Sequence, residues 1–130
     1  MSVRSSSSLR RVLLLDAAIS GATGILMVAG ATAFDALFGV PAPLVRYSGL
    51  VLLLFAALVL YFARSEGLSS GRVWTVILMN AAWVAASVLV LVSGWIDPTA
   101  LGMAFVILQA LAVAALAEVQ YTAMRRSLAA

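Results

Sequence analysis

Four long apolar stretches restrict the fold of this chain more than any other feature of its sequence. They cover residues 12–33, 43–63, 73–95 and 99–124. An α-helix rises about 1.5 Å per residue, so each stretch is long enough to cross the roughly 30 Å of hydrocarbon in a bilayer. Hydrocarbon offers no partner to a free backbone N–H or C=O group, which leaves helices as the form that these stretches can take. We therefore predict four transmembrane helices.

The segments between these stretches are short and contain residues typical of turns. Gly and Pro occur within residues 35–43 and 94–98, and Gly and Ser occur within residues 64–72. Short connections place consecutive helices antiparallel. The predicted fold class is all-α: an integral membrane four-helix up-and-down bundle that forms a single transmembrane domain over residues 1–130.

The composition agrees with a membrane location and excludes several kinds of site. Apolar residues make up 65% of the chain and charged residues 10%, whereas soluble domains are about half apolar and a quarter charged. The chain has no Cys and no His, which removes disulfides, thiolate and imidazole metal sites, and catalysis by Cys or His. No phosphate-binding loop, nucleophile elbow or metal-ligand spacing is found in the sequence. We expect no enzymatic activity, no cofactor and no metal.

The arginines predict the orientation of the bundle. All eight basic residues are arginines, and they lie near the ends of the apolar stretches. Seven fall on the side that also holds both termini, and only Arg46 falls on the other. Cytoplasmic loops of membrane proteins carry the excess of basic residues, so we predict that both termini are cytoplasmic. This spread does not form a phosphate-binding face, so we expect the lipid bilayer and no nucleic acid as a partner. The seven are Arg4, Arg10, Arg11, Arg64, Arg72, Arg125 and Arg126.

The first apolar stretch has an alternative interpretation as a cleavable signal peptide. Arg10 and Arg11 precede it, and the small residues Ala31, Thr32 and Ala33 end it. Against cleavage, the stretch is longer than the 7–15 apolar residues of a typical signal peptide and it contains an aspartate. We therefore expect the first helix to be retained.

An internal repeat also argues for a retained first helix. Residues 12–30 align with residues 76–94 without gaps, and seven of the nineteen aligned residues are identical. Asp16 aligns with Asn80, the one strongly polar residue of the third stretch. Both repeats begin on the same side, so the bundle would consist of two parallel helical-hairpin repeats related by an axis along the membrane normal.

Three polar residues within the apolar stretches form the candidate site. Asp16, Asn80 and Glu118 lie in one depth band, about 6–10 Å inside the cytoplasmic ends of their helices by helical rise. Ionisable groups at such a depth are costly, and by default they indicate a functional site. Two interpretations stay open. The cluster is structural, through hydrogen bonds between helices and pairing with nearby arginines, or it binds a proton, an ion or a ligand.

Two further polar residues are secondary candidates. Gln109 lies near the middle of the fourth stretch, and Gln120 follows eleven residues later on nearly the same helical face. A hydrogen bond between helices is the expected role of Gln109. Arg46 lies one turn into the second stretch, where it can reach the membrane interface or pair with Asp35 or Asp97.

Pairs of small residues four positions apart also occur in the apolar stretches. This spacing lets helix backbones approach closely, either inside the monomer or between copies of the chain. A homo-oligomer or another membrane protein is therefore an expected partner. The pairs are Ala17 with Gly21, Ser20 with Gly24, Ala81 with Ala85, Ala82 with Ala86, and Ala110 with Ala114.

Nearly the whole chain resembles small uncharacterised four-helix inner-membrane proteins of bacteria. The resemblance is carried by the runs LLLDAAISGATGILMVAG, RYSGLVLLLFAALV, NAAWVAASVLVLVSG and ALGMAFVILQALAVAALAEVQY. It implies a four-helix fold and a location in the bacterial inner membrane, and it implies no activity.

Two functions remain as hypotheses from the sequence. The first is a non-enzymatic binding, accessory or assembly component of the membrane, because the chain has almost no part outside the apolar stretches and carries faces of small residues. The alternative is a small oligomeric transporter or channel that uses the cluster of Asp16, Asn80 and Glu118. Four helices alone could hardly line a path, so this alternative needs an oligomer.

Overall fold

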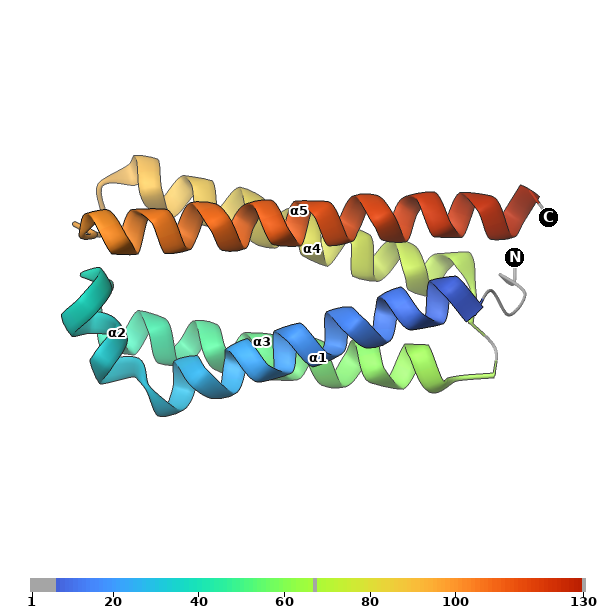
Figure 1. Ribbon diagram of the computed structural model, residues 1–130, viewed down its shortest axis with the longest axis horizontal. Helices are drawn as coiled ribbons and strands as arrows, with labels where there is room; N and C mark the ends of the chain where they lie inside the picture. The colour runs from blue at the N-terminus through green and yellow to red at the C-terminus, as the bar shows by residue number, and fades with distance from the viewer. Residues whose placement is uncertain (1–6, 67, 130) are drawn as a thin grey trace.

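The computed structural model describes residues 7–66 and 68–129 of the chain. Its helices follow the order predicted for an up-and-down bundle, with one short helix added (Figure 1). The four long helices have the length and hydropathy needed to cross a membrane, so the chain is a multi-pass membrane protein and the predicted fold class is confirmed. The helices are α1 (Ser7–Ala29), α2 (Ala31–Phe38), α3 (Ala42–Arg64), α4 (Ser70–Ser93) and α5 (Ala100–Ala129).

The two ends of the bundle differ in charge. Helix α1 begins and α5 ends at one end, where α3 also ends and α4 begins (Figure 1). We name this the arginine-rich end, and the opposite end, where α2 lies, the α2 end. Arg46 is exposed near the α2 end. The described arginines at the arginine-rich end are Arg10, Arg11, Arg64, Arg72, Arg125 and Arg126.

The first connection differs from its prediction. The stretch predicted as one helix over residues 12–33 is interrupted at Gly30, and the residues that follow form α2. The N–H of Gly30 still donates to the oxygen of Leu26, 2.7 Å away, but the Gly30 backbone lies outside the helical region at φ −104° and ψ 18°. Helix α2 ends at Gly39, whose φ of 67° is the left-handed conformation that glycine adopts without strain.

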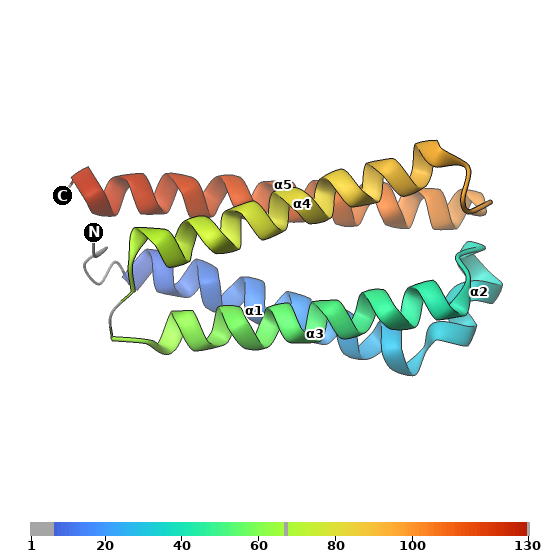
Figure 2. The same cartoon turned by 180° about the vertical axis from the view of Figure 1, so that it is seen from behind.

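The long helices form two pairs. Helix α1 packs along α3, and α4 packs along α5 (Figures 1 and 2). Helix α1 also contacts α5, whereas α3 and α4 contact each other little although they are consecutive in the chain. The bundle is therefore two helix pairs that meet mainly through α1 and α5.

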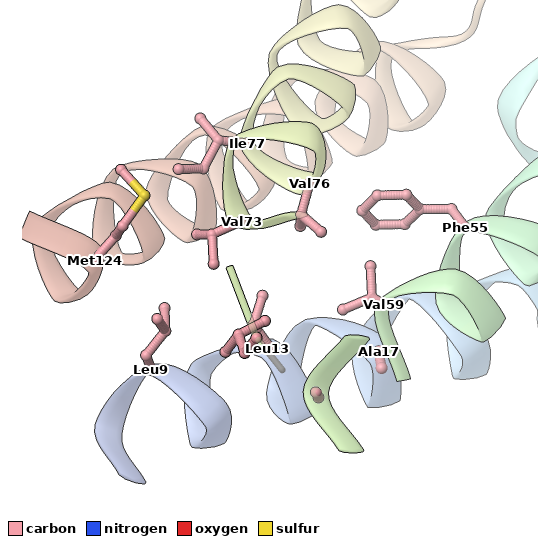
Figure 3. Packing of buried hydrophobic residues seen from close by; sticks show 11 residues of the cluster. Leu9, Leu13, Ala17, Phe55, Val59, Val73, Val76, Ile77 and Met124 are labelled. Atoms are coloured by element: carbon pink, nitrogen blue, oxygen red, sulfur yellow. The ribbon is translucent and has the colours of Figure 1, made fainter. Parts of the chain in front are cut away.

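The two pairs come together at the arginine-rich end around an apolar core (Figure 3). Leu9, Leu13, Val59, Val73 and Val76 are each wholly removed from the surface. These side chains come from three helices, so burying them favours the association of the two pairs. Other members of this core are Ala17, Phe55, Ala63, Leu68, Ile77 and Met124.

At the α2 end, the short helix joins α1 to α5. The rings of Phe38 and Phe105 stack with centroids 5.0 Å apart, and Phe34 meets both rings edge-on. The N–H of Thr99 donates to the oxygen of Phe38 at 3.0 Å, and its hydroxyl donates to the oxygen of Leu37 at 2.8 Å. Helix α2 is thereby fixed against the start of α5.

The predicted repeat is only partly reflected in the structure. Asp16 and Asn80 are both buried, as expected if the two hairpins turn the aligned positions toward the bundle interior. In the described chain, residues 94–99 after α4 form no helix, so α2 has no counterpart in the second hairpin. The superposition of the two hairpins stays a prediction.

Candidate functional site

The buried polar side chains gather around the carboxylate of Asp16. Asn80 on α4 donates to Oδ2 of Asp16 at 2.9 Å, and Gln120 on α5 donates to the same oxygen at 2.6 Å. Ser20, one turn further along α1, donates to Oδ1 at 3.0 Å. Asn80 also donates to Oε1 of Gln120 at 3.1 Å. We refer to Asp16, Ser20, Asn80 and Gln120 as the Asp16 cluster.

Every hydrogen-bond partner of Asp16 among the described residues is a donor, so both of its carboxyl oxygens act as acceptors. Asp16 is 1% exposed, Asn80 3% and Gln120 0%. Within the part of the chain that the structure describes, no basic side chain lies within ion-pair distance of Asp16. The carboxylate of Asp16 is therefore held by three neutral side chains. It is not paired with an arginine, which was one of the two interpretations drawn from the sequence.

The Asp16 cluster lies where the two helix pairs meet. Asp16 belongs to the α1–α3 pair, and its amide donors belong to the α4–α5 pair. The apolar core with the buried side chains of Leu9, Leu13, Val73 and Met124 lies on the side of the arginine-rich end (Figure 3). The arrangement can hold the two pairs in register, and the apolar core separates it from water at that end.

The structure brings two of the three predicted cluster residues together. Asp16 and Asn80 are hydrogen-bonded, but Glu118 is exposed on α5 and takes no part in the cluster. Its place is taken by Gln120. Two residues along a helix correspond to about 200° of rotation, so Glu118 and Gln120 cannot face the same side of α5. The expectation that Glu118 shares the cluster is therefore wrong.

The secondary candidate Gln109 belongs to a second polar group. Its Oε1 accepts from the indole N–H of Trp83 at 2.7 Å, and its Nε2 donates to the hydroxyl of Ser87 at 2.9 Å and to the oxygen of Val106 at 2.9 Å. Ser87 in turn donates to the oxygen of Trp83 at 2.8 Å. These bonds connect α4 to α5, which confirms the hydrogen bond between helices expected for Gln109.

Two other charged residues near helix ends, Arg10 and Asp35, have local partners. Arg10 donates to the oxygens of Ala63 and Ser65, at 2.6 and 2.7 Å, where its charge also suits the negative end of the α3 dipole. At the opposite end of α3, the carboxylate of Asp35 accepts from the N–H of Ala42 at 3.1 Å. The described part of the chain shows no ion pair between Arg46 and Asp35 or Asp97.

A cavity of about 150 Å³ lies between the two helix pairs in the half of the bundle toward the α2 end. All five helices contribute to its wall, and Trp83, Ser87 and Gln109 form part of it. The cavity is partly open to the surface of the bundle. Leu44 of α3 and Ala86 of α4 line it and are also exposed, and these two helices contact each other little.

Sequence reasoning did not predict this cavity or the role of Gln120. Gln109 and Gln120 are eleven residues apart and therefore lie on nearly the same face of one helix. This spacing was the signal from which a buried Gln120 could have been predicted. Among the described residues, no group of three or more Asp and Glu side chains could hold a metal ion.

Comparison with known proteins gave no relative: the chain matches no protein-family model, no curated protein and no solved structure.

Proposed function

We propose that this protein is a non-enzymatic binding, accessory or assembly component of the bacterial inner membrane, with both termini in the cytoplasm. It acts through contacts made within the membrane, and not by moving a solute or transforming a substrate.

One observation carries this proposal: the only acidic side chain buried in the described part of the bundle is fully engaged by its own helices. Asp16 accepts hydrogen bonds from Ser20, Asn80 and Gln120. Among the described residues, every fully buried side-chain nitrogen or oxygen atom has a hydrogen-bond partner. A transport site has to release and rebind an ion or a proton, which requires access from water. The apolar core beside the Asp16 cluster gives no such access from the arginine-rich end.

The orientation and the membrane are part of the proposal. Six described arginines lie at the arginine-rich end and one near the α2 end, which favours a cytoplasmic arginine-rich end. The resemblance to bacterial inner-membrane proteins supports the choice of membrane. Reporter fusions after Ser2, within the connection at Ser69 and at Ala130 should all give cytoplasmic signals. A periplasmic signal at either terminus would contradict the orientation.

Flux measurements separate this proposal from the transporter or channel alternative. The purified protein is reconstituted into liposomes, and proton and monovalent cation flux are measured for the wild type, Asp16→Asn and the exposed-site control Glu118→Gln. We expect no flux above that of empty liposomes for any of them. Flux through the wild type that disappears in Asp16→Asn would establish the transporter instead.

Crosslinking in native membranes, followed by mass spectrometry, tests the binding half of the proposal. We expect crosslinks to a second copy of the chain or to another membrane protein, and these should persist in Asp16→Asn because that residue lies inside the bundle. A chain that crosslinks to no protein in its native membrane would contradict a role in binding or assembly.

A further inference from the structure

We propose that the cavity at the α2 end binds one acyl chain of a membrane glycerophospholipid, whose ester carbonyl oxygen accepts hydrogen bonds from Thr23 and Ser48. This inference concerns the interior of the bundle, so it holds whichever protein binds the outer surface.

Two hydroxyl groups in the cavity wall have no partner within the described chain. Thr23 and Ser48 are half-buried and both line the cavity, and neither takes part in a hydrogen bond within the described chain. Hydroxyls on α4 and α5, by contrast, donate to their own backbone: Ser87 to the oxygen of Trp83 at 2.8 Å, and Thr122 to that of Glu118 at 3.0 Å. An unmatched hydroxyl in an apolar medium is costly. The two free donors therefore call for an acceptor that enters the cavity.

The crossing of α1 and α3 holds these hydroxyls on one wall. A Cβ atom added at Gly49 would lie 2.9 Å from the oxygen of Gly24, and one added at Gly24 would lie 2.9 Å from the oxygen of Gly49. The two backbones are thus in direct contact at the glycines. Thr23 and Ser48 each immediately precede one of these glycines, so the contact fixes both donors beside the cavity.

The rest of the wall suits hydrocarbon. The polar groups opposite, on Trp83, Ser87 and Gln109, are hydrogen-bonded to one another and offer no free donor. An apolar cavity of 150 Å³ can hold a molecule the size of benzene, which corresponds to about six carbon atoms. A segment of an acyl chain has this size, and it can enter between α3 and α4 directly from the bilayer.

The charge of the wall favours an ester over a free fatty acid. Among the described residues, none that lines the cavity is basic, so a fatty-acid carboxylate would be buried there without a counter-charge, which is costly. An ester carbonyl presents the same acceptor oxygen without the charge. Of the two sources of an acyl chain in a membrane, the phospholipid is therefore the occupant that fits.

Fluorescence quenching by brominated lipids tests the proposal, because Trp83 lines the cavity. Trp74 and Trp95 are changed to Phe so that Trp83 is the only tryptophan. This protein is reconstituted with increasing fractions of a phosphatidylcholine that carries bromine on its acyl chains, in an ester-linked form or in an ether-linked form that lacks the carbonyl. We expect the ester lipid to quench Trp83 at a several-fold lower fraction than the ether lipid.

The variant Thr23→Val with Ser48→Ala removes both hydroxyls and nearly keeps their shapes, so it should fold like the wild type. It should lose the difference between ester and ether lipid. A protein whose only tryptophan is Trp95, which is 83% exposed, serves as the control and should show no difference in either background. Equal quenching of Trp83 by the two lipids in the wild type, or a difference that survives in the variant, would overturn the proposal.

Native mass spectrometry of the purified protein identifies the source of the chain. We expect a phospholipid to remain bound and to be lost in part from the double variant. A bound free fatty acid in its place would overturn the assignment of the ester. None of these measurements depends on flux or on a protein partner, so their failure is distinct from failure of the proposed function.

Discussion

At the scale of single residues, the hydrogen bonds of Asp16 determine what its charge can do. Both oxygens accept bonds, and the donors come from three helices. A side chain with these hydrogen bonds stabilises the packing of the helices that donate them. The residue therefore matters to this protein mainly as an acceptor, and its formal charge matters less.

Two substitutions separate these properties of Asp16. In Asp16→Asn, the amide oxygen can take the position of Oδ2 and accept from Asn80 and Gln120, while the amide nitrogen donates to the hydroxyl of Ser20. We expect a loss of about 0.6 kcal/mol in unfolding free energy, the average for hydrogen bonds between membrane helices. Asp16→Leu removes the acceptor and leaves buried donors unmatched, so we expect a loss of about 1–3 kcal/mol.

Unfolding of the purified variants in mixed micelles with increasing detergent denaturant measures both losses, and Glu118→Gln is the exposed control. If Asp16→Asn lost as much stability as Asp16→Leu, the charge itself would be the property that the bundle needs.

The sequence predicted Asp16 and Asn80 because strongly polar residues are rare in its apolar stretches and these two align in the repeat. It did not distinguish Glu118 from Gln120, which lie at similar depth. Apolar residues surround α5 on every side, so the sequence pattern gives no packing face for that helix. Only the packed bundle shows which of the two points inward.

At the scale of helices, the contact between α1 and α3 depends on glycine at two positions. The backbones touch at Gly24 and Gly49, so neither position has room for a side chain. The sequence analysis identified the pair Ser20 and Gly24 as a small-residue face, but it assigned no role to Gly49. The missing information was the partner helix, because spacing within one helix does not reveal what crosses it.

A matched pair of alanine substitutions tests this contact. The Cβ atom of Gly49→Ala would lie 2.9 Å from both the oxygen of Gly24 and the Cβ of Met27, so α1 and α3 would have to move apart. We expect a loss of about 1–3 kcal/mol in unfolding free energy, as for overpacked cores.

The matched control is Gly21→Ala. Gly21 also faces α3, but a Cβ atom added there would meet the Cβ of Ala56 at an ordinary 3.7 Å. Because alanine favours helix more than glycine does, this control should be neutral or slightly stabilising. Equal losses in the two variants would show that the glycines do not set the separation of the helices.

Helix α2 shows a different limit of sequence reasoning. Length and hydropathy predicted the membrane-spanning helices but extended the first of them across Gly30. Residues 31–38 are apolar enough to continue that helix, yet the helix is interrupted at a single glycine, after which Phe34 packs against Phe105. That packing joins residues far apart in the chain, so no local pattern could indicate it.

At the scale of the whole molecule, the weak contact between α3 and α4 is the feature that the sequence did not predict. An up-and-down bundle allows each helix to pack on either neighbour, and short connections suggested that consecutive helices would pair. In the structure α3 and α4 are consecutive yet contact each other little. Direct packing of α3 on α4 therefore contributes little to holding the bundle together, and the Asp16 cluster, the apolar core and the α2 end do so instead.

This arrangement predicts that the chain can be divided into its two helix pairs and will reassemble. Residues 1–66 and 67–130, expressed together as separate chains, should each insert as a helical hairpin, because transmembrane helices can insert independently before they associate. A tag on the first fragment should then recover the second fragment from detergent extracts.

Asp16→Leu in the first fragment removes two of the hydrogen bonds that join the pairs and leaves Asn80 and Gln120 without their acceptor. At a cost of about 1.4 kcal/mol, within the range for unmatched buried donors, the association constant should fall about tenfold. Asp16→Asn should keep recovery close to that of the wild type, and Glu118→Gln in the second fragment should not change it. Fragments that fail to associate would show that the α3–α4 connection is essential to the bundle. Recovery undiminished by Asp16→Leu would show that the apolar core and the α2 end hold the pairs together without the Asp16 cluster.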